Sequence, residues 1–322
     1  MANDDTAGAR NLGVPTSISE LAREQLALTM SLDMADGEQP EDAAAWEAMI
    51  AFANEMLLAM LPAPAAGTSV TESTLGGVAV YEVEPEAPAS DLVCLFLHGG
   101  ALIIGAGPVG GAMTTSFAEG AGIRSIGVDY RMPPAHPYPA ALDDCVAAYR
   151  ALLERHDPSS IVVGGQSAGG NLAPATVLRA RDEGLPLPAA VVLLTPEADL
   201  TESGDSFVTL QGVDPVLRTP QRPTIQLYAG DRDLADPMLS PLFGDFAKGF
   251  PPTFLQCGTR DLFLSNTVRF HRALRRCGVR AELHVFEAMP HGGFGSILEG
   301  GLGQAPEDRE VYEELRRFLA SV

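Results

Sequence analysis

The sequence of 322 residues has few basic side chains and few cysteines for its length. Its 21 Lys and Arg residues are outnumbered by 42 Asp and Glu residues, which gives a formal net charge of −21 at pH 7. A chain this acidic repels the phosphates of nucleic acids and the anionic surfaces of membranes. We therefore expect neither nucleic acid nor a membrane as a partner.

The four cysteines form no metal-binding or redox motif. None belongs to a C-x-x-C pair or lies at the spacing from a histidine that zinc ligands show. They fall in apolar stretches, and we expect reduced thiols that pack in the core, with no metal bound. They are Cys94, Cys145, Cys257 and Cys277.

No stretch has the pattern of a targeting signal or a membrane span. Residues 1–13 are polar and include Asp4 and Asp5, unlike the apolar core of a secretory signal peptide. No apolar run approaches the length that crosses a bilayer. With 46% hydrophobic residues, the chain is typical of a globular protein with a large core. We expect it to be cytoplasmic.

From residue 78 onward, short apolar strands alternate with helical stretches. Such alternation predicts an α/β fold with a mostly parallel sheet flanked by helices, in which ligands bind at the carboxyl ends of the strands. The last strand lies near a sheet edge and is a candidate for pairing two chains in a homodimer. The predicted strands cover residues 78–83, 92–97, 125–128, 161–163, 190–194, 253–256 and 282–286.

Two segments do not follow this alternation. Residues 1–62 are predicted to be helical. We expect their apolar stripe to pack in the core, with a place in the acyl pocket as the alternative. Residues 199–250 are rich in Pro, Gly and Asp, and a connection that long is functional or carries its own helices. We predict that the two segments form a helical cap over a core made of residues 63–198 and 251–322. The stripe consists of Met49, Phe52, Met56 and Met60.

One serine stands among glycines between a predicted strand and a predicted helix. The stretch reads Gly-Gly-Gln-Ser-Ala-Gly-Gly over residues 164–170, directly after a β-branched run and before a helical one. A turn this sharp strains its apex residue and crowds the neighbouring backbone, so small residues are needed on both sides. The pattern G-x-S-x-G therefore predicts an exposed Ser167 hydroxyl at the start of a helix.

A serine needs a base within hydrogen-bond reach and donors for the developing oxyanion, and three other strand ends carry such groups. His98-Gly99-Gly100-Ala101 follows the strand 92–97, and its glycines free backbone N–H groups to bind a ligand. Asp261 and His291 follow the strands 253–256 and 282–286. The order Ser, Asp, His is the one expected of an α/β-hydrolase.

The residues offer more than one candidate for the acid of the triad. Residues 224–229 also have the composition of a strand and end in Gly230-Asp231. Asp231, Asp233 and Asp236 are therefore competitors of Asp261. We favour Asp261 because of its place at a strand end and the loop geometry that a triad needs.

Together these motifs resemble the hormone-sensitive-lipase-like carboxylesterases, the bacterial family IV of the α/β-hydrolases. Residues 98–101 resemble that family's H-G-G-G loop, and residues 165–171 resemble its G-D-S-A-G-G-N turn. Residues 129–144 resemble its D-Y-R-L-A-P-E-H-x-F-P-A-A-x-x-D stretch. The resemblance runs from about residue 75 to the end of the chain.

The resemblance implies a serine carboxylesterase that hydrolyses short- to medium-chain acyl esters without a cofactor. Ser167 is then the nucleophile, His291 the base and Asp261 the acid, and the N–H groups of three residues form the oxyanion hole. The same triad would also serve a lactonase or an amidase or deacetylase. A relative that only binds small molecules is a further alternative. The oxyanion-hole residues are Gly99, Gly100 and Ala168.

Four positions depart from the family pattern. Ala101 replaces the third glycine of the first loop, and Gln166 replaces an acidic or threonine residue beside the nucleophile. Asp261 does not lie in the common D-P-L-x-D motif. Pro174 falls inside the predicted helix after the nucleophile, where it removes one backbone hydrogen bond and is expected to kink or loosen the first turns.

Overall fold

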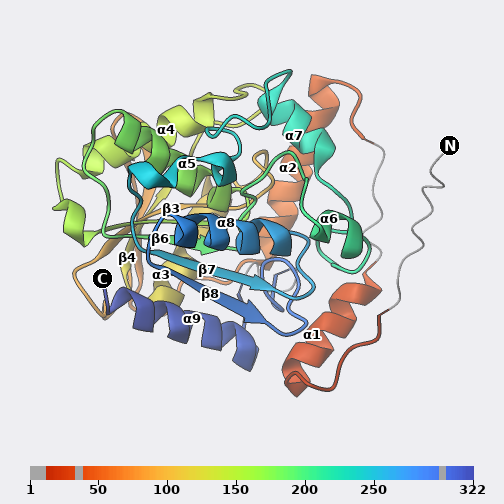
Figure 1. The fold of residues 1–322 in the computed structure, drawn as a ribbon. Coiled ribbons are helices and arrows are strands. Elements are labelled where there is room, and N and C mark those ends of the chain that lie inside the picture. Colours follow the sequence, from red (N-terminus) through yellow and green to blue (C-terminus); the bar gives the residue numbers. More distant parts are fainter. Residues whose placement is uncertain (1–11, 33–38, 297–301) are drawn as a thin grey trace.

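An eight-stranded sheet forms the centre of the computed structural model, which describes residues 12–32, 39–296 and 302–322 (Figure 1). The strand order is β1-β2-β4-β3-β5-β6-β7-β8. β1 and β4 pair with β2 in antiparallel fashion, and all other neighbours are parallel, so the predicted mostly parallel sheet is confirmed. The strands are β1 Ser69–Leu75, β2 Val78–Glu84, β3 Val93–Leu97, β4 Arg124–Val128, β5 Ile161–Gln166, β6 Ala190–Leu194, β7 Thr253–Gly258 and β8 Ala281–Phe286.

Helices cover both faces of the sheet (Figure 1). One face packs against α4, α5 and α8, and the other against α3 and α9. Three single 3₁₀ turns, η1, η2 and η3, lie in the connections. The bounds are α3 Pro108–Ala121, α4 Ala140–Leu152, α5 Gly169–Asp182, α8 Leu264–Arg276, α9 Pro306–Leu319, η1 Pro158–Ser160, η2 Pro241–Phe243 and η3 Phe246–Lys248.

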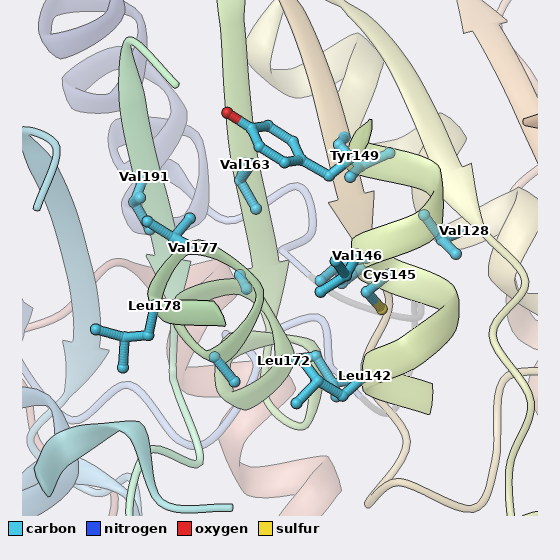
Figure 2. Packing of buried hydrophobic residues seen from close by; sticks show 14 of the residues in the cluster. Val128, Leu142, Cys145, Val146, Tyr149, Val163, Leu172, Val177, Leu178 and Val191 are labelled. Carbon is cyan, nitrogen blue, oxygen red and sulfur yellow. The ribbon is translucent and has the colours of Figure 1, made fainter. Parts of the chain in front are cut away.

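The core between α4, α5 and the sheet is made of aliphatic side chains at helical and strand spacing. Leu142 and Val146 of α4 face Leu172 of α5 across the space above β5, where Val163 closes the layer (Figure 2). Each of these side chains is at most 4% exposed. Burying an aliphatic side chain of this size contributes roughly 1.5–3 kcal/mol, so this layer holds β5 and α5 rigidly in place.

The register of the parallel strands brings their carboxyl ends to one level. In β3 and β5, Leu97 pairs with Gly165, and in β5 and β6, Gln166 pairs with Leu194. The residues that follow β3, β5 and β6 therefore emerge side by side. This edge of the sheet is where the sequence places the candidate site.

The segments predicted as a cap contribute helices at the end of the sheet to which the arrowheads of β7 and β8 point (Figure 1). The first segment forms α1 and α2, and the second forms α6 and α7. Their boundaries as domains stay a prediction, and residues 1–11 of the first segment lie outside the described residues. The bounds are α1 Glu20–Ser31, α2 Ala43–Met60, α6 Ser206–Thr209 and α7 Arg222–Ala229.

Two local predictions are corrected here. Residues 224–229, which have the composition of a strand, belong to the helix α7. Pro223 in the first turn and Gly230 at the C-cap bound this helix, and both residue types favour these positions. β1 is polar on most of its length and was not predicted, yet it pairs with β2 through the two-residue turn Gly76-Gly77, both at positive φ.

The apolar stripe on α2 does not pack in the core, contrary to the expectation. Phe52 is 65% exposed and Met56 is 47% exposed, while Trp46 is the buried side chain of this helix. By length and composition alone, α2 is long and apolar enough to cross a membrane, and 6% of it is buried. The expectation that no apolar run approaches that length is therefore wrong. The cytoplasmic location stays a prediction.

Two further expectations concern cysteines and the sheet edge. Cys94, Cys145 and Cys257 are buried as predicted, but Cys277 is exposed because it caps the end of α8 at the surface. β8 is an edge strand, as expected. The pairing of two chains through this edge stays a prediction.

Candidate active site

A sharp turn through Ser167 and Ala168 connects β5 to α5. Ser167 has a φ of 56°, a left-handed conformation that is strained for a residue with a side chain. A Cβ at Gly165 would lie 2.1 Å from the carbonyl oxygen of Gly169, and a Cβ at Gly169 would lie 1.8 Å from the carbonyl oxygen of Leu97. Both glycines are therefore required for the close approach of β3, β5 and α5 around the serine.

Ser167, His291 and Asp261 form a continuous row of hydrogen bonds. His291 Nε2 lies 2.8 Å from Ser167 Oγ, and His291 Nδ1 lies 3.0 Å from Asp261 Oδ1. Asp261 is fully buried and His291 is 5% exposed, so water does not compete for these contacts. Asp261 Oδ1 also accepts the N–H of Phe263 at 2.8 Å, which fixes the carboxylate.

The competing carboxylates lie elsewhere on the surface. Asp231, Asp233 and Asp236 are all exposed, in the connection that follows α7. Asp233 and Asp236 accept hydrogen bonds from backbone N–H groups two residues further on, at 3.0 and 2.8 Å. These are the local turns that aspartate commonly forms, and the row at the serine does not include them.

The charges around His291 favour its protonated form. Burial lowers the pKa of this imidazole, but the carboxyl groups of Asp261, Asp214 and Glu197 raise it, and the net result lies above its ordinary value. The ring of Phe263 packs edge-on against the imidazole, with centroids 4.9 Å apart. An imidazole held in this way accepts a proton readily and keeps one orientation while it does so.

Three backbone N–H groups next to Ser167 are free to bind a ligand. Within the described part of the chain, the N–H groups of Gly99, Gly100 and Ala168 donate no backbone hydrogen bond. Gly100 has a φ of 121°, and a Cβ there would lie 2.1 Å from the carbonyl oxygen of Ile104. Ala101 also adopts a positive φ of 52°, so the loop keeps its shape without a third glycine.

Groups behind this loop hold it in place. His98 is buried, and its Nδ1 lies 2.8 Å from the carbonyl oxygen of Gly99. Tyr130 stacks on the His98 ring and donates its hydroxyl to the His98 carbonyl at 2.8 Å. His98 therefore holds the loop by local hydrogen bonds. From α2, Asn54 Oδ1 accepts the N–H of Gly105 at 2.8 Å, which links this helix to the loop.

Asp214, in the second predicted cap segment, was missed by the sequence analysis. It is fully buried, and its Oδ2 accepts the N–H of Leu262 at 2.8 Å, while its Oδ1 accepts the N–H of Val216 at 2.9 Å. The N–H of His291 lies 3.5 Å from Oδ1. Burial and the neighbouring Asp261 raise the pKa of Asp214 to about 7. One side chain therefore contacts both loops that carry the predicted acid and base.

Glu197 was also missed, although it follows the strand β6 as Asp261 follows β7. It is 2% exposed, and its backbone N–H donates to the carbonyl of Ser167 at 3.0 Å. Burial raises the pKa of its carboxyl to about 8, with a smaller contribution from Glu202. An acidic residue directly after a buried strand was the signal that could have identified it.

A cavity of about 280 Å³ opens beside Ser167. Its walls are mostly aliphatic and aromatic, and they come from α2, from the two glycine loops and from residues 216–221. A larger cavity of about 430 Å³ is lined by residues of α3 and α9 and contains none of the predicted site residues. The lining of the first cavity includes Leu57, Met113, Glu197, Val216, Leu217 and Phe263.

The described residues contain no group of three or more His, Cys, Asp or Glu side chains that could hold a metal ion. The chemistry that the arrangement itself supports is attack by a hydroxyl, with a base, an oriented carboxylate and free N–H donors around it.

Comparisons with known proteins agree with this arrangement. Residues 94–295 match a family model described as the alpha/beta hydrolase fold. An acetyl-hydrolase of Streptomyces hygroscopicus is 33% identical over 227 residues, which cover 70% of this chain and 74% of that protein. An esterase of Acinetobacter venetianus is 33% identical over 218 residues, which cover 67% of this chain and 71% of that protein.

Solved structures show the same relationship over almost the whole chain. The crystal structure of an esterase superposes with a TM-score of 0.88 at 36% identity and covers 99% of both chains. A hormone-sensitive lipase from a metagenome library superposes with a TM-score of 0.82 at 30% identity and covers 93% of this chain and 97% of that one. The chain therefore belongs to the α/β-hydrolase family, and within it to the hormone-sensitive-lipase-like carboxylic ester hydrolases.

Proposed function

We propose that the protein hydrolyses short- to medium-chain acyl esters through a triad of Ser167, His291 and Asp261. The observation that carries this proposal is the row of two hydrogen bonds, 2.8 and 3.0 Å long, that ends at a serine hydroxyl beside a cavity. A neutral imidazole in contact with a serine is the base that such a hydroxyl needs, and the buried carboxylate sets its tautomer.

In the first half of the reaction, Ser167 Oγ attacks the ester carbonyl while His291 Nε2 takes the hydroxyl proton. The tetrahedral intermediate collapses, His291 gives this proton to the leaving alcohol, and the acyl group stays on Ser167 as an ester. In the second half, water attacks the acyl carbon with His291 as base, and the acid is released as Ser167 recovers its proton. Asp261 stabilises the imidazolium in both halves.

The oxyanion of each tetrahedral intermediate would bind the N–H groups of Gly99, Gly100 and Ala168. Removing one such donor in an enzyme typically costs about 3 kcal/mol of transition-state stabilisation. The N–H of Ala168 also lies at the start of α5, where the helix dipole favours negative charge. This supports acyl transfer over a role in binding alone.

The size of the cavity supports the predicted chain length. Pockets for drug-sized ligands span roughly 300–1,000 Å³, and the cavity of about 280 Å³ lies just below that range. One relative is named an acetyl-hydrolase, which also indicates a short acyl group. Leu57 of α2 and Leu217 of the second predicted cap segment line this cavity and would contact the substrate.

The experiment is a series of initial rates on p-nitrophenyl esters from acetyl to palmitoyl, with wild type and Ser167→Ala. We expect the highest kcat/KM at short to medium chains and a loss on the order of 10⁶-fold in kcat for Ser167→Ala. The matched control is Ser90→Ala, at an exposed serine outside the site, which should retain wild-type rates.

Two results would contradict the proposal. Residual activity of Ser167→Ala at the wild-type level would exclude this serine as the nucleophile. A folded wild-type protein that hydrolyses none of the esters, but hydrolyses lactones or amides, would assign the same triad to one of those substrate classes instead.

A further inference from the structure

Glu197 is fixed beside the nucleophile by its backbone. Its N–H donates to the carbonyl of Ser167 at 3.0 Å, and its carbonyl accepts the side-chain amide of Asn171 at 2.8 Å. Asn171 in turn donates to the carbonyl of Leu239 at 2.8 Å, so the position is anchored on both sides. These contacts hold the backbone of Glu197 at the wall of the active-site cavity, which this residue lines.

The carboxyl group of Glu197 is not held by the described part of the chain. Among the described residues, Glu197 Oε2 is buried without a hydrogen bond, and no side-chain hydrogen bond or ion pair involves this residue. Buried polar groups in folded proteins are nearly always paired, because an unpaired one costs desolvation energy. The triad does not use this group. A buried, unpaired carboxyl on the wall of a substrate cavity indicates a contact that the substrate completes.

Nearby basic side chains are either absent or engaged. The described residues that line the cavity include no Lys or Arg. The neighbouring Glu202 already binds the N–H of Gln221 at 2.5 Å and the guanidinium of Arg222 at 2.6 Å. Arg222 is therefore engaged by Glu202. The remaining cationic neighbour of Glu197 is the imidazole of His291, which the proposed mechanism uses.

The protonation of Glu197 suits a donor on the substrate. Because burial raises the pKa of Glu197 to about 8, the empty site holds a neutral carboxyl near neutral pH. An opposite charge within about 4–6 Å lowers the pKa of a carboxyl by roughly 1–3 units. A cation that enters the cavity would therefore release this proton to solvent and leave a carboxylate to pair with it.

We propose that Glu197 binds an ammonium group of the substrate, so that the cavity prefers esters that carry an amine over neutral esters of the same shape. This inference rests on the proposed esterase function. Two further observations favour a cation over an anion. The buried Asp261 and Asp214 both contact His291, which lines the same cavity. The chain also carries a net charge of −21, which raises the local concentration of cations.

The test compares pairs of esters that differ by one amine. On the alcohol side, 2-(dimethylamino)ethyl butanoate is paired with 3-methylbutyl butanoate, in which a CH group replaces the nitrogen. On the acyl side, methyl 3-aminobutanoate is paired with methyl 3-methylbutanoate, and methyl 3-hydroxybutanoate adds a neutral donor. Acid release is followed by titration near neutral pH for the wild type, Glu197→Gln and Glu154→Gln, the last of which removes an exposed charge outside the cavity.

We expect the ratio of kcat/KM for the amine ester over its isostere to fall in Glu197→Gln by about 10- to 100-fold in at least one pair. This is the range that a hydrogen bond between charged groups provides. The change should appear mainly in KM, because the contact is made in the ground state as well as in the transition state. Glu154→Gln should leave the ratio within about 2-fold of the wild type, because exposed charges are screened.

The outcomes separate this inference from the proposed function. If neutral esters are hydrolysed and Glu197→Gln leaves the kcat/KM ratio of amine ester over isostere unchanged in both pairs, the inference is overturned and the proposed function stands. In Glu197→Gln, the kcat/KM ratio of the hydroxyl ester over methyl 3-methylbutanoate could fall while the ratio of the amine ester does not. This result would also overturn the inference, because the carboxyl would then bind neutral donors. A folded wild type that hydrolyses none of the esters would overturn the proposed function and this inference with it.

Discussion

Two neighbouring strands are followed by buried carboxyl groups that the protein holds in different ways. After β7, Asp261 Oδ1 contacts the imidazole of His291 and accepts the N–H of Phe263, while Oδ2 is buried without a hydrogen bond among the described residues. After β6, Glu197 has a well-anchored backbone, but its Oε2 has no hydrogen-bond partner within the described ranges of the chain. The same placement on the sheet thus yields one group that the protein itself positions and one that is left for a ligand. Position on the fold identifies the site, whereas hydrogen-bond partners distinguish the roles within it.

Within this comparison, the largest expected effect comes from removing the charge of Asp261. Asp261→Asn keeps the shape of the side chain but no longer stabilises the imidazolium or the required tautomer of His291. We expect kcat for a short p-nitrophenyl ester to fall by about 10⁴-fold, with little change in KM. Glu183→Asn, at an exposed site on the far end of α5, is the control. A loss of less than about 10-fold would show that another carboxylate supplies the acid.

Asp214 links the loop that carries Asp261 to the second predicted cap segment, and the variant Asp214→Asn tests that link. Both carboxylate oxygens of Asp214 accept backbone N–H groups, whereas an amide has only one oxygen and adds an NH₂ group. At least one buried N–H donor is then left without a partner, which costs about 1–3 kcal/mol. Because this strain lies on the loops that carry Asp261 and His291, we expect kcat/KM to fall by roughly 10- to 100-fold.

The pH profile of Asp214→Asn separates positioning from simple destabilisation. His291 must be neutral to act as base, so the activity of the wild type should rise with pH through the raised pKa of this imidazole. Removing the nearby carboxyl lowers that pKa and should shift the rising limb of kcat/KM to lower pH. A lower rate with an unshifted limb would indicate that Asp214 acts on the fold alone.

The difference between the two strand ends also shows what the sequence could predict. Ser167, Asp261 and His291 were found because each is a polar residue in the loop that follows a strand, in an order that one fold explains. Glu197 carries the same signal but no motif, and it was overlooked. Asp214 lies far from any strand in a Pro- and Gly-rich connection, so only the folded chain brings it to Leu262.

The helices outside the sheet were less predictable for a physical reason. A strand in the centre of a sheet is buried on both faces, so its apolar run has one interpretation. An apolar helix such as α2 can face the core, a cavity or solvent with the same sequence. Leu57 lines the cavity while Phe52, five residues earlier on the same helix, is 65% exposed, and helical periodicity alone does not separate them.

An effect on stability, and not on rate, sharpens the contrast at Glu197. In the folded protein its carboxyl has a pKa of about 8, against an ordinary value of 4.5. Between pH 4.5 and about 8 the folded state holds a proton that the unfolded state has lost. The contribution of Glu197 to stability is therefore present in full below pH 4.5 and is lost as pH rises through about 8. Asp214 acts in the same direction over a narrower window, since its pKa is raised to about 7.

Glu197→Gln cannot titrate, so its stability should be insensitive to this proton. We expect the free energy of unfolding of the wild type, measured by urea titration, to decrease relative to that of the variant as pH rises between 4.5 and 8. The relative slope should approach, and not exceed, about 1.4 kcal/mol per pH unit, the value for a single proton. Parallel curves for the two proteins would mean that Glu197 is charged in the folded state and therefore paired. In that case the contrast between the ends of β6 and β7 would not exist.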